Sequence, residues 1–146
     1  MEVTDIACRQ SVQSVSYDWP PMPPSRARIL LAEDEAKVAQ PVVNRFTEVG
    51  HDIHWVRAVR DVRRELPTFS PDVLILDTTL DTDGLELLQA LRFAPQAPPG
   101  GVVILTEPGD IGSRERAHQL GAAAVVSKPI QGDELVDVVA DLLTFI

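Results

Sequence analysis

The sequence contains little cysteine and no long apolar run. Its single cysteine, Cys8, excludes an internal disulfide framework and is typical of a protein of the reducing cytoplasm. No segment approaches the roughly 20 consecutive apolar residues that a membrane-spanning helix requires. The N-terminus also lacks the basic and then apolar pattern of a secretory signal peptide. We therefore expect a cytoplasmic protein.

Positive charge is scarce as well. The chain has 13 Lys and Arg residues against 22 Asp and Glu, which gives a formal net charge of −9. Phosphate backbones attract basic surfaces, so this charge argues against nucleic acid as a direct partner. The exception is a short arginine cluster, made of Arg57, Arg60, Arg63 and Arg64. Two interpretations remain open for it: a solvated helix face, or a surface that docks on an acidic partner.

The composition changes near residue 26. Residues 1–26 are rich in Ser and Gln and end in a proline-rich stretch, and prolines favour extended chain. We predict a flexible N-terminal extension followed by one domain at 27–146, which is long enough for a sizeable core. The alternative to a flexible extension is that it packs on the domain or on a partner through Tyr17, Trp19 and Met22.

The domain alternates between apolar runs and segments with helical spacing of apolar residues. We predict strands at 28–32, 52–56, 72–77, 101–106 and 123–127, and helices at 36–49, 60–66, 85–93, 112–120 and from 132 to the end. Pro41 is expected to bend the first helix. Three strands are apolar almost throughout, as in parallel sheets buried on both faces. The predicted fold is a doubly wound α/β domain with a five-stranded parallel sheet in the flavodoxin-like order 2-1-3-4-5 and helices on both faces.

Reactive polar residues stand where four of these apolar runs end. They are Glu33, Asp34, Asp77, Thr106 and Lys128. In an open α/β sheet the carboxyl ends of parallel strands share one edge, where ligands bind. Packed carboxylates repel one another unless a cation lies between them, so the set indicates a site for Mg²⁺ and a phosphoryl group. In the alternative, Glu33 and Asp34 are a helix-capping pair.

Between residues 28 and 146 the chain resembles the receiver domain of two-component response regulators. The resemblance rests on the order and spacing of six motifs: Leu30-Leu31-Ala32-Glu33-Asp34-Glu35, Val73-Leu74-Ile75-Leu76-Asp77, Asp83-Gly84, Leu105-Thr106, Leu120-Gly121-Ala122 and Ser127-Lys128-Pro129. It implies that a sensor histidine kinase or a histidine phosphotransfer protein is a partner. It also implies a downstream protein target.

The resemblance further implies a role for each residue at the sheet edge. Asp77 would accept the phosphoryl group, and Mg²⁺ would be held by Asp34 and Asp77, with Glu33 acting through water. Lys128 would pair with Asp77 and then with the phosphate. The Thr106 hydroxyl would donate to a phosphoryl oxygen. A cis peptide would precede Pro129.

The sequence departs from the family pattern at three positions. Asp81 stands where the family usually has a proline, in a loop that is one residue short. Glu107 replaces a small residue beside the pocket, where its carboxylate would repel a phosphoryl group. Val125 replaces an aromatic switch residue. The last helix also carries acids but no Lys or Arg, so the salt bridges typical of receiver dimers lack a basic half, which favours a monomer or an atypical dimer.

Three functions fit these residues. The first is a phosphoacceptor signalling module without an attached output domain, which catalyses only its own phosphorylation and dephosphorylation. The second is a divergent receiver that binds partners independently of phosphorylation, which Glu107 and Val125 favour. The third is a phosphatase of the haloacid dehalogenase type, which needs a second acid where Thr79 stands.

Overall fold

The computed structural model describes residues 26–80 and 84–144. The predicted N-terminal extension lies outside the described residues, apart from Arg26. Asp81 and the rest of its short loop also lie outside them. Within the described ranges, no helix is both long and apolar enough to cross a membrane.

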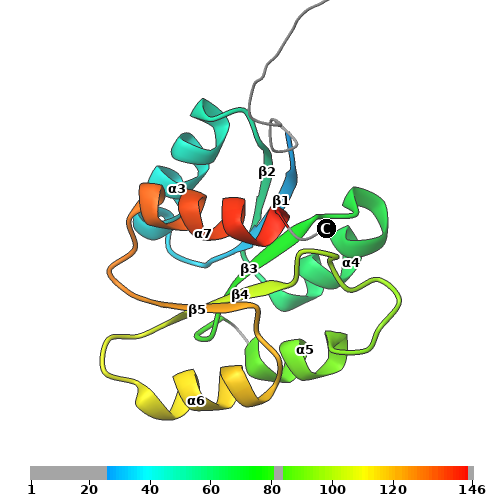
Figure 1. Cartoon of the computed structure of the whole chain (residues 1–146), viewed down its shortest axis with the longest axis vertical. Helices are drawn as coiled ribbons and strands as arrows, with labels where there is room; N and C mark the ends of the chain where they lie inside the picture. The colour runs from blue at the N-terminus through cyan, green and yellow to red at the C-terminus, as the bar shows by residue number, and fades with distance from the viewer. Residues whose placement is uncertain (1–25, 81–83, 145–146) are drawn as a thin grey trace, which may run out of the picture.

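The centre of the fold is a five-stranded parallel sheet (Figure 1). Its strands are β1 (Arg28–Ala32), β2 (Asp52–Val56), β3 (Val73–Asp77), β4 (Val102–Thr106) and β5 (Ala124–Ser127). The order is β2-β1-β3-β4-β5, as predicted. Every residue of β3 and β4 is buried, because these strands are covered on both faces.

Helices cover both faces of the sheet (Figure 1). They are α3 (Ala36–Glu48), α4 (Val59–Phe69), α5 (Gly84–Leu91), α6 (Ile111–Gln119) and α7 (Gly132–Leu143). Alternate strand residues point to opposite faces. Leu30 and Leu74 therefore join a core with α4, α5 and α6, while Ile29 and Ile75 join a second core with α3 and α7.

The predicted end of the helix at 60–66 was wrong, because α4 continues through Pro67 to Phe69. Phe69 is buried and its ring stacks on His54 with 3.8 Å between ring centroids, so packing favours the extra turn. The helix stops at Ser70, which has a left-handed backbone with φ of 51°. Most other predicted boundaries differ by one or two residues, and α7 ends at Leu143.

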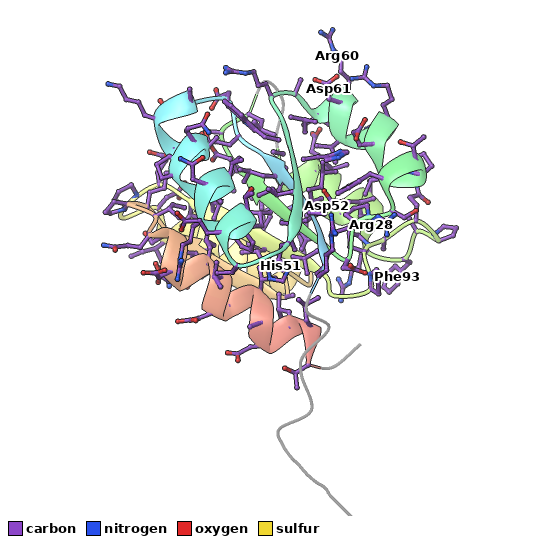
Figure 2. The ribbon with its side chains drawn as sticks, turned by 90° about the horizontal axis from the view of Figure 1, so that it is seen from above. Arg28, His51, Asp52, Arg60, Asp61 and Phe93 are labelled. Carbon is purple, nitrogen blue, oxygen red and sulfur yellow. The ribbon has the colours of Figure 1, made fainter. Side chains whose placement is uncertain are left out.

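The two edges of the sheet differ in chemistry. Figure 2 shows Arg28, His51 and Asp52 close together where β1 and β2 begin, and Arg28 is the register partner of Asp52. Arg60 and Asp61 lie apart from them at the start of α4 (Figure 2). The opposite edge, where the strands end, holds the polar residues singled out by the sequence.

Candidate functional site

The strand register brings the predicted residues to one edge. Ala32 is level with Leu76, and Thr106 is level with Ser127, so the residues that end or follow these strands are neighbours. Glu33, Asp77 and Thr106 are each 0 % exposed. Buried polar groups are costly unless they have partners, so three at one edge mark a functional site.

Lys128 links the site. Its Nζ lies 3.0 Å from Asp77 Oδ2, 2.9 Å from Glu107 Oε2 and 3.7 Å from Glu33 Oε1. Burial lowers the pKa of Lys128, but the hydrogen bonds to Glu107 and Asp77 and the nearby negative charge outweigh it and raise that pKa. The ammonium is therefore charged at neutral pH. The peptide bond between Lys128 and Pro129 is cis, as predicted.

Three carboxylates form a compact acidic group. Glu33, Asp34 and Asp77 each offer an oxygen within 4.8 Å of the others. Burial raises the pKa of Glu33 to about 8, and the Asp77 carboxylate adds to the rise while the backbone N–H of Glu35 opposes it. Glu33 Oε1 is buried without a hydrogen-bond partner. A buried oxygen that accepts no hydrogen bond, in a group with two further carboxylates, fits a divalent cation with oxygen ligands.

The capping interpretation of Glu33 and Asp34 is only partly right. Glu35 occupies the N-cap position of α3, and its side chain makes no capping hydrogen bond. Glu33 Oε2 accepts the backbone N–H of Glu35 at 3.0 Å, so this carboxylate also steadies the start of the helix. Asp34 is exposed, whereas Glu33 is buried in the site.

Thr79 contacts Asp77 in a way that the sequence reasoning missed. Its backbone N–H and its hydroxyl donate to Asp77 Oδ1 at 3.0 and 3.1 Å. A hydroxyl residue two positions after an aspartate is a signal for such a local turn. Both oxygens of Asp77 therefore have donors, since Oδ2 accepts from Lys128. The hydroxyls of Thr78 and Thr106 are buried and have no hydrogen-bond partner.

Trp55 and Arg57 hold the acidic loop, and neither was singled out for this role. Trp55 Nε1 donates to the Glu33 carbonyl at 2.7 Å. Arg57 donates to the Asp34 carbonyl at 3.2 Å and lies over the Trp55 ring, 4.4 Å from its centroid. These contacts fix the backbone that carries two of the three acids.

Two of the three departures from the family pattern, Glu107 and Val125, lie among the residues that the structure describes. Glu107 does lie beside the site, and it forms an ion pair with Lys128 there. Val125 is half-buried in β5 and packs against the core of α4, α5 and α6. A valine in that position offers no aromatic ring that could change places.

The comparisons with known proteins agree with one another. Residues 29–140 match the family model described as the response regulator receiver domain. The transcriptional activator protein IrlR of Burkholderia pseudomallei is 36% identical over 117 residues, which cover 80% of this chain and 50% of that protein. The swarming motility regulation protein RssB of Serratia marcescens is 34% identical over 109 residues, which cover 74% of this chain and 49% of that protein. The chain thus spans about half the length of these curated relatives.

Solved structures share the fold over the same region. The signal receiver domain of a putative LuxO repressor protein from Vibrio parahaemolyticus has a TM-score of 0.74 and 30% identity, and the match covers 82% of this chain and 92% of that one. A putative response regulator from Chloroflexus aurantiacus has a TM-score of 0.75 and 25% identity, with coverage of 82% and 98%. With its sheet order, its edge residues and these matches, the chain belongs to the response regulator receiver domain family.

Proposed function

We propose that this receiver domain accepts a phosphoryl group on Asp77 in a Mg²⁺-dependent reaction. The donor would be a histidine kinase or a histidine phosphotransfer protein. The observation that carries the proposal is the buried Asp77 carboxylate, held 3.0 Å from the Lys128 ammonium and grouped with two further acids. A strand-end carboxylate with such partners has the properties of a nucleophile for phosphoryl transfer.

In the proposed reaction a carboxylate oxygen of Asp77 attacks the phosphorus of a phosphohistidine. A phosphorus–oxygen bond forms, the phosphorus–nitrogen bond breaks, and its electron pair stays with the departing imidazole. Lys128 then donates to a phosphoryl oxygen, and the unpartnered hydroxyl of Thr106 is a second donor. Glu33, Asp34 and Asp77 would hold Mg²⁺, which would offset negative charge on the phosphoryl oxygens.

The proposed chemistry is limited to phosphorylation and dephosphorylation of the domain itself. The phosphorylated domain would signal in the cytoplasm through contacts with a downstream protein. The net charge of −9 supports a protein partner over nucleic acid. The acidic exposed residues of α7, namely Asp133, Glu134, Asp137 and Asp141, support a monomer or an atypical dimer.

A second candidate function is partner binding that does not depend on phosphorylation. The Glu107 carboxylate favours this second function, because it already forms an ion pair with the Lys128 ammonium, 2.9 Å away, that a phosphoryl group would need. The intact acidic group and the free Thr106 hydroxyl favour the first function instead.

Intact-mass spectrometry after incubation with acetyl phosphate and Mg²⁺ separates the two functions. The parent protein should gain one phosphoryl group, and Asp77→Asn should gain none, because the amide is not a nucleophile. Asp52→Asn is the matched control, since Asp52 lies at the opposite edge of the sheet, and it should label like the parent. A parent protein that stays unlabelled would favour the second function.

A further inference from the structure

We propose that Glu107 is an internal counter-anion that occupies Lys128 in the resting domain and must be displaced by the incoming phosphoryl group. This inference rests on the proposed function and adds a regulatory residue to the same site. It starts from the ion pair between Glu107 Oε2 and Lys128 Nζ at 2.9 Å, which is slightly shorter than the 3.0 Å between Lys128 and Asp77.

Two acids hold the ammonium of Lys128 at short range. It carries three N–H donors, and Asp77 and Glu107 lie 3.0 and 2.9 Å from its nitrogen, while Glu33 Oε1 lies 3.7 Å away and accepts no hydrogen bond. A phosphoryl group on Asp77 would bring further negative charge beside this ammonium. It would then compete with the carboxylates that now pair with Lys128.

Burial decides which carboxylate leaves. Asp77 and Glu33 have side chains that are 0 % exposed, so neither can exchange the ammonium for water. The Glu107 side chain is 47 % exposed and can rotate into solvent, where its charge is hydrated. Among the described residues that contact Lys128, Glu107 is thus the acid that can be displaced.

The displacement would reach the start of α6. The backbone N–H of Asp110 donates to the Glu107 carbonyl at 3.2 Å, and the Asp110 side chain caps α6 by accepting the N–H of Ser113 at 3.1 Å. A backbone shift at Glu107 that accompanies the release of its side chain would act on the segment that begins this helix. The first residue of α6, Ile111, is 64% exposed and available to a partner. Such a route needs no aromatic residue at position 125.

The kinetic test uses two substitutions that separate charge from bulk. Glu107→Gln removes the charge and keeps the size, and Glu107→Ala removes both. Both should be labelled by acetyl phosphate and Mg²⁺ about two- to fivefold faster than the parent, as loss of a half-exposed ion pair allows. The gain should shrink at high salt, because salt screens the charge.

Asp141→Asn is the matched charge control. Asp141 is exposed near the end of α7 that lies away from Lys128, so this change should leave the rate at the parent value. Unchanged or slower labelling of both Glu107 variants would overturn the proposal. Acceleration in Glu107→Ala alone would overturn it too, because bulk and not charge would then be the obstacle.

A crystal structure with beryllium fluoride and Mg²⁺ tests the displacement directly. The fluoride complex mimics a phosphoryl group on Asp77, and Glu107 should then lie more than 4 Å from Lys128. A bound mimic with the ion pair intact would overturn the displacement and leave the proposed function standing. Failure of the parent to bind the mimic or to label would count against the proposed function itself, and this inference would fall with it.

Discussion

At the scale of single residues, burial and charge together explain the site. Asp77 is held by Lys128 on one oxygen and by Thr79 on the other, so its orientation is set before any donor arrives. Glu33 and Asp34 are adjacent in sequence but differ in environment, since Glu33 is buried and Asp34 is exposed. A substitution at the exposed Asp34 disturbs no buried packing, so Asp34 is the better residue to test for metal binding.

The first prediction concerns Asp34 and Mg²⁺. Mg²⁺ at about ten times its dissociation constant should stabilise the parent protein by about 1.4 kcal/mol, because it binds the folded state. Asp34→Asn should lose most of this effect, and Glu35→Gln should keep it, since Glu35 is an exposed neighbour outside the acidic group. Thermal unfolding with and without Mg²⁺ is the measurement. An equal rise in melting temperature in Asp34→Asn and the parent would rule out Asp34 as a ligand.

At the scale of elements, close backbone packing positions the site. Gly84 begins α5 and lies against the end of β3. A Cβ atom there would come within 2.7 Å of the Asp77 carbonyl oxygen and 3.3 Å of the Thr78 Cα. Neither backbone atom can move without shifting the Asp77 side chain.

The second prediction follows from this packing. Gly84→Ala should lower stability by about 1–3 kcal/mol, as overpacking of a well-packed region does. It should also slow labelling of Asp77, because the carboxylate is displaced. Gly112→Ala is the control, since a Cβ there would meet its nearest heavy atom only at 3.9 Å. Urea unfolding and intact-mass labelling measure the two effects, and a Gly84→Ala protein that matches the parent in both would contradict the prediction.

The third prediction concerns the opposite edge of the sheet, where His51 Nδ1 accepts the backbone N–H of Ala27 at 3.1 Å. Only an unprotonated Nδ1 can accept, and burial lowers the pKa of His51 below 6.5, although Asp72 opposes the shift. Below pH 6.5 the unfolded chain therefore binds a proton that the folded protein excludes. The contribution of His51 to the free energy of unfolding should be fully present above pH 6.5 and should decrease as the pH falls from 6.5 towards 5.

The variant His51→Asn isolates this titration. Its amide oxygen can accept the same N–H but does not titrate in this range. The difference in unfolding free energy between pH 7 and pH 5 should therefore be smaller in His51→Asn than in the parent. An identical pH dependence in the two proteins would show that other groups control it.

At the scale of the whole molecule, the sheet separates two apolar cores. Val62 of α4 belongs to one core and Val139 of α7 to the other, and both are 0 % exposed. The strands lie between the two cores, and their side chains alternate between the two faces of the sheet. Each core therefore contributes its own share of the stability.

The fourth prediction tests this separation. Val62→Ala and Val139→Ala should each lower the free energy of unfolding by about 2 kcal/mol, because each change removes two buried methyl carbons and leaves a cavity. The double variant should lose about the sum, because distant sites without shared partners act independently. Urea unfolding of the four proteins measures the cycle. A coupling well above about 0.5 kcal/mol would mean that the sheet transmits strain between the cores.

The sequence by itself determined the sheet and the position of the site. Apolar runs of strand length that end in Asp77, Thr106 and Lys128 encode buried parallel strands with a polar edge, because the pattern of burial is local. The order of the strands was predicted from the alternation of strands and helices, and the cis peptide before Pro129 from the resemblance to the family; both are present.

Tertiary structure alone decided the contacts between these segments. The sequence predicted that Glu107 would repel a phosphoryl group, but its ion pair with Lys128 depends on how the ends of β4 and β5 face each other. Likewise, the helix predicted to end at residue 66 continues through Pro67, because the burial of Phe69 outweighs the local preference of the chain. Strand patterns are encoded locally in the sequence, whereas the partner of a charged or aromatic side chain is set by the fold that brings distant segments together.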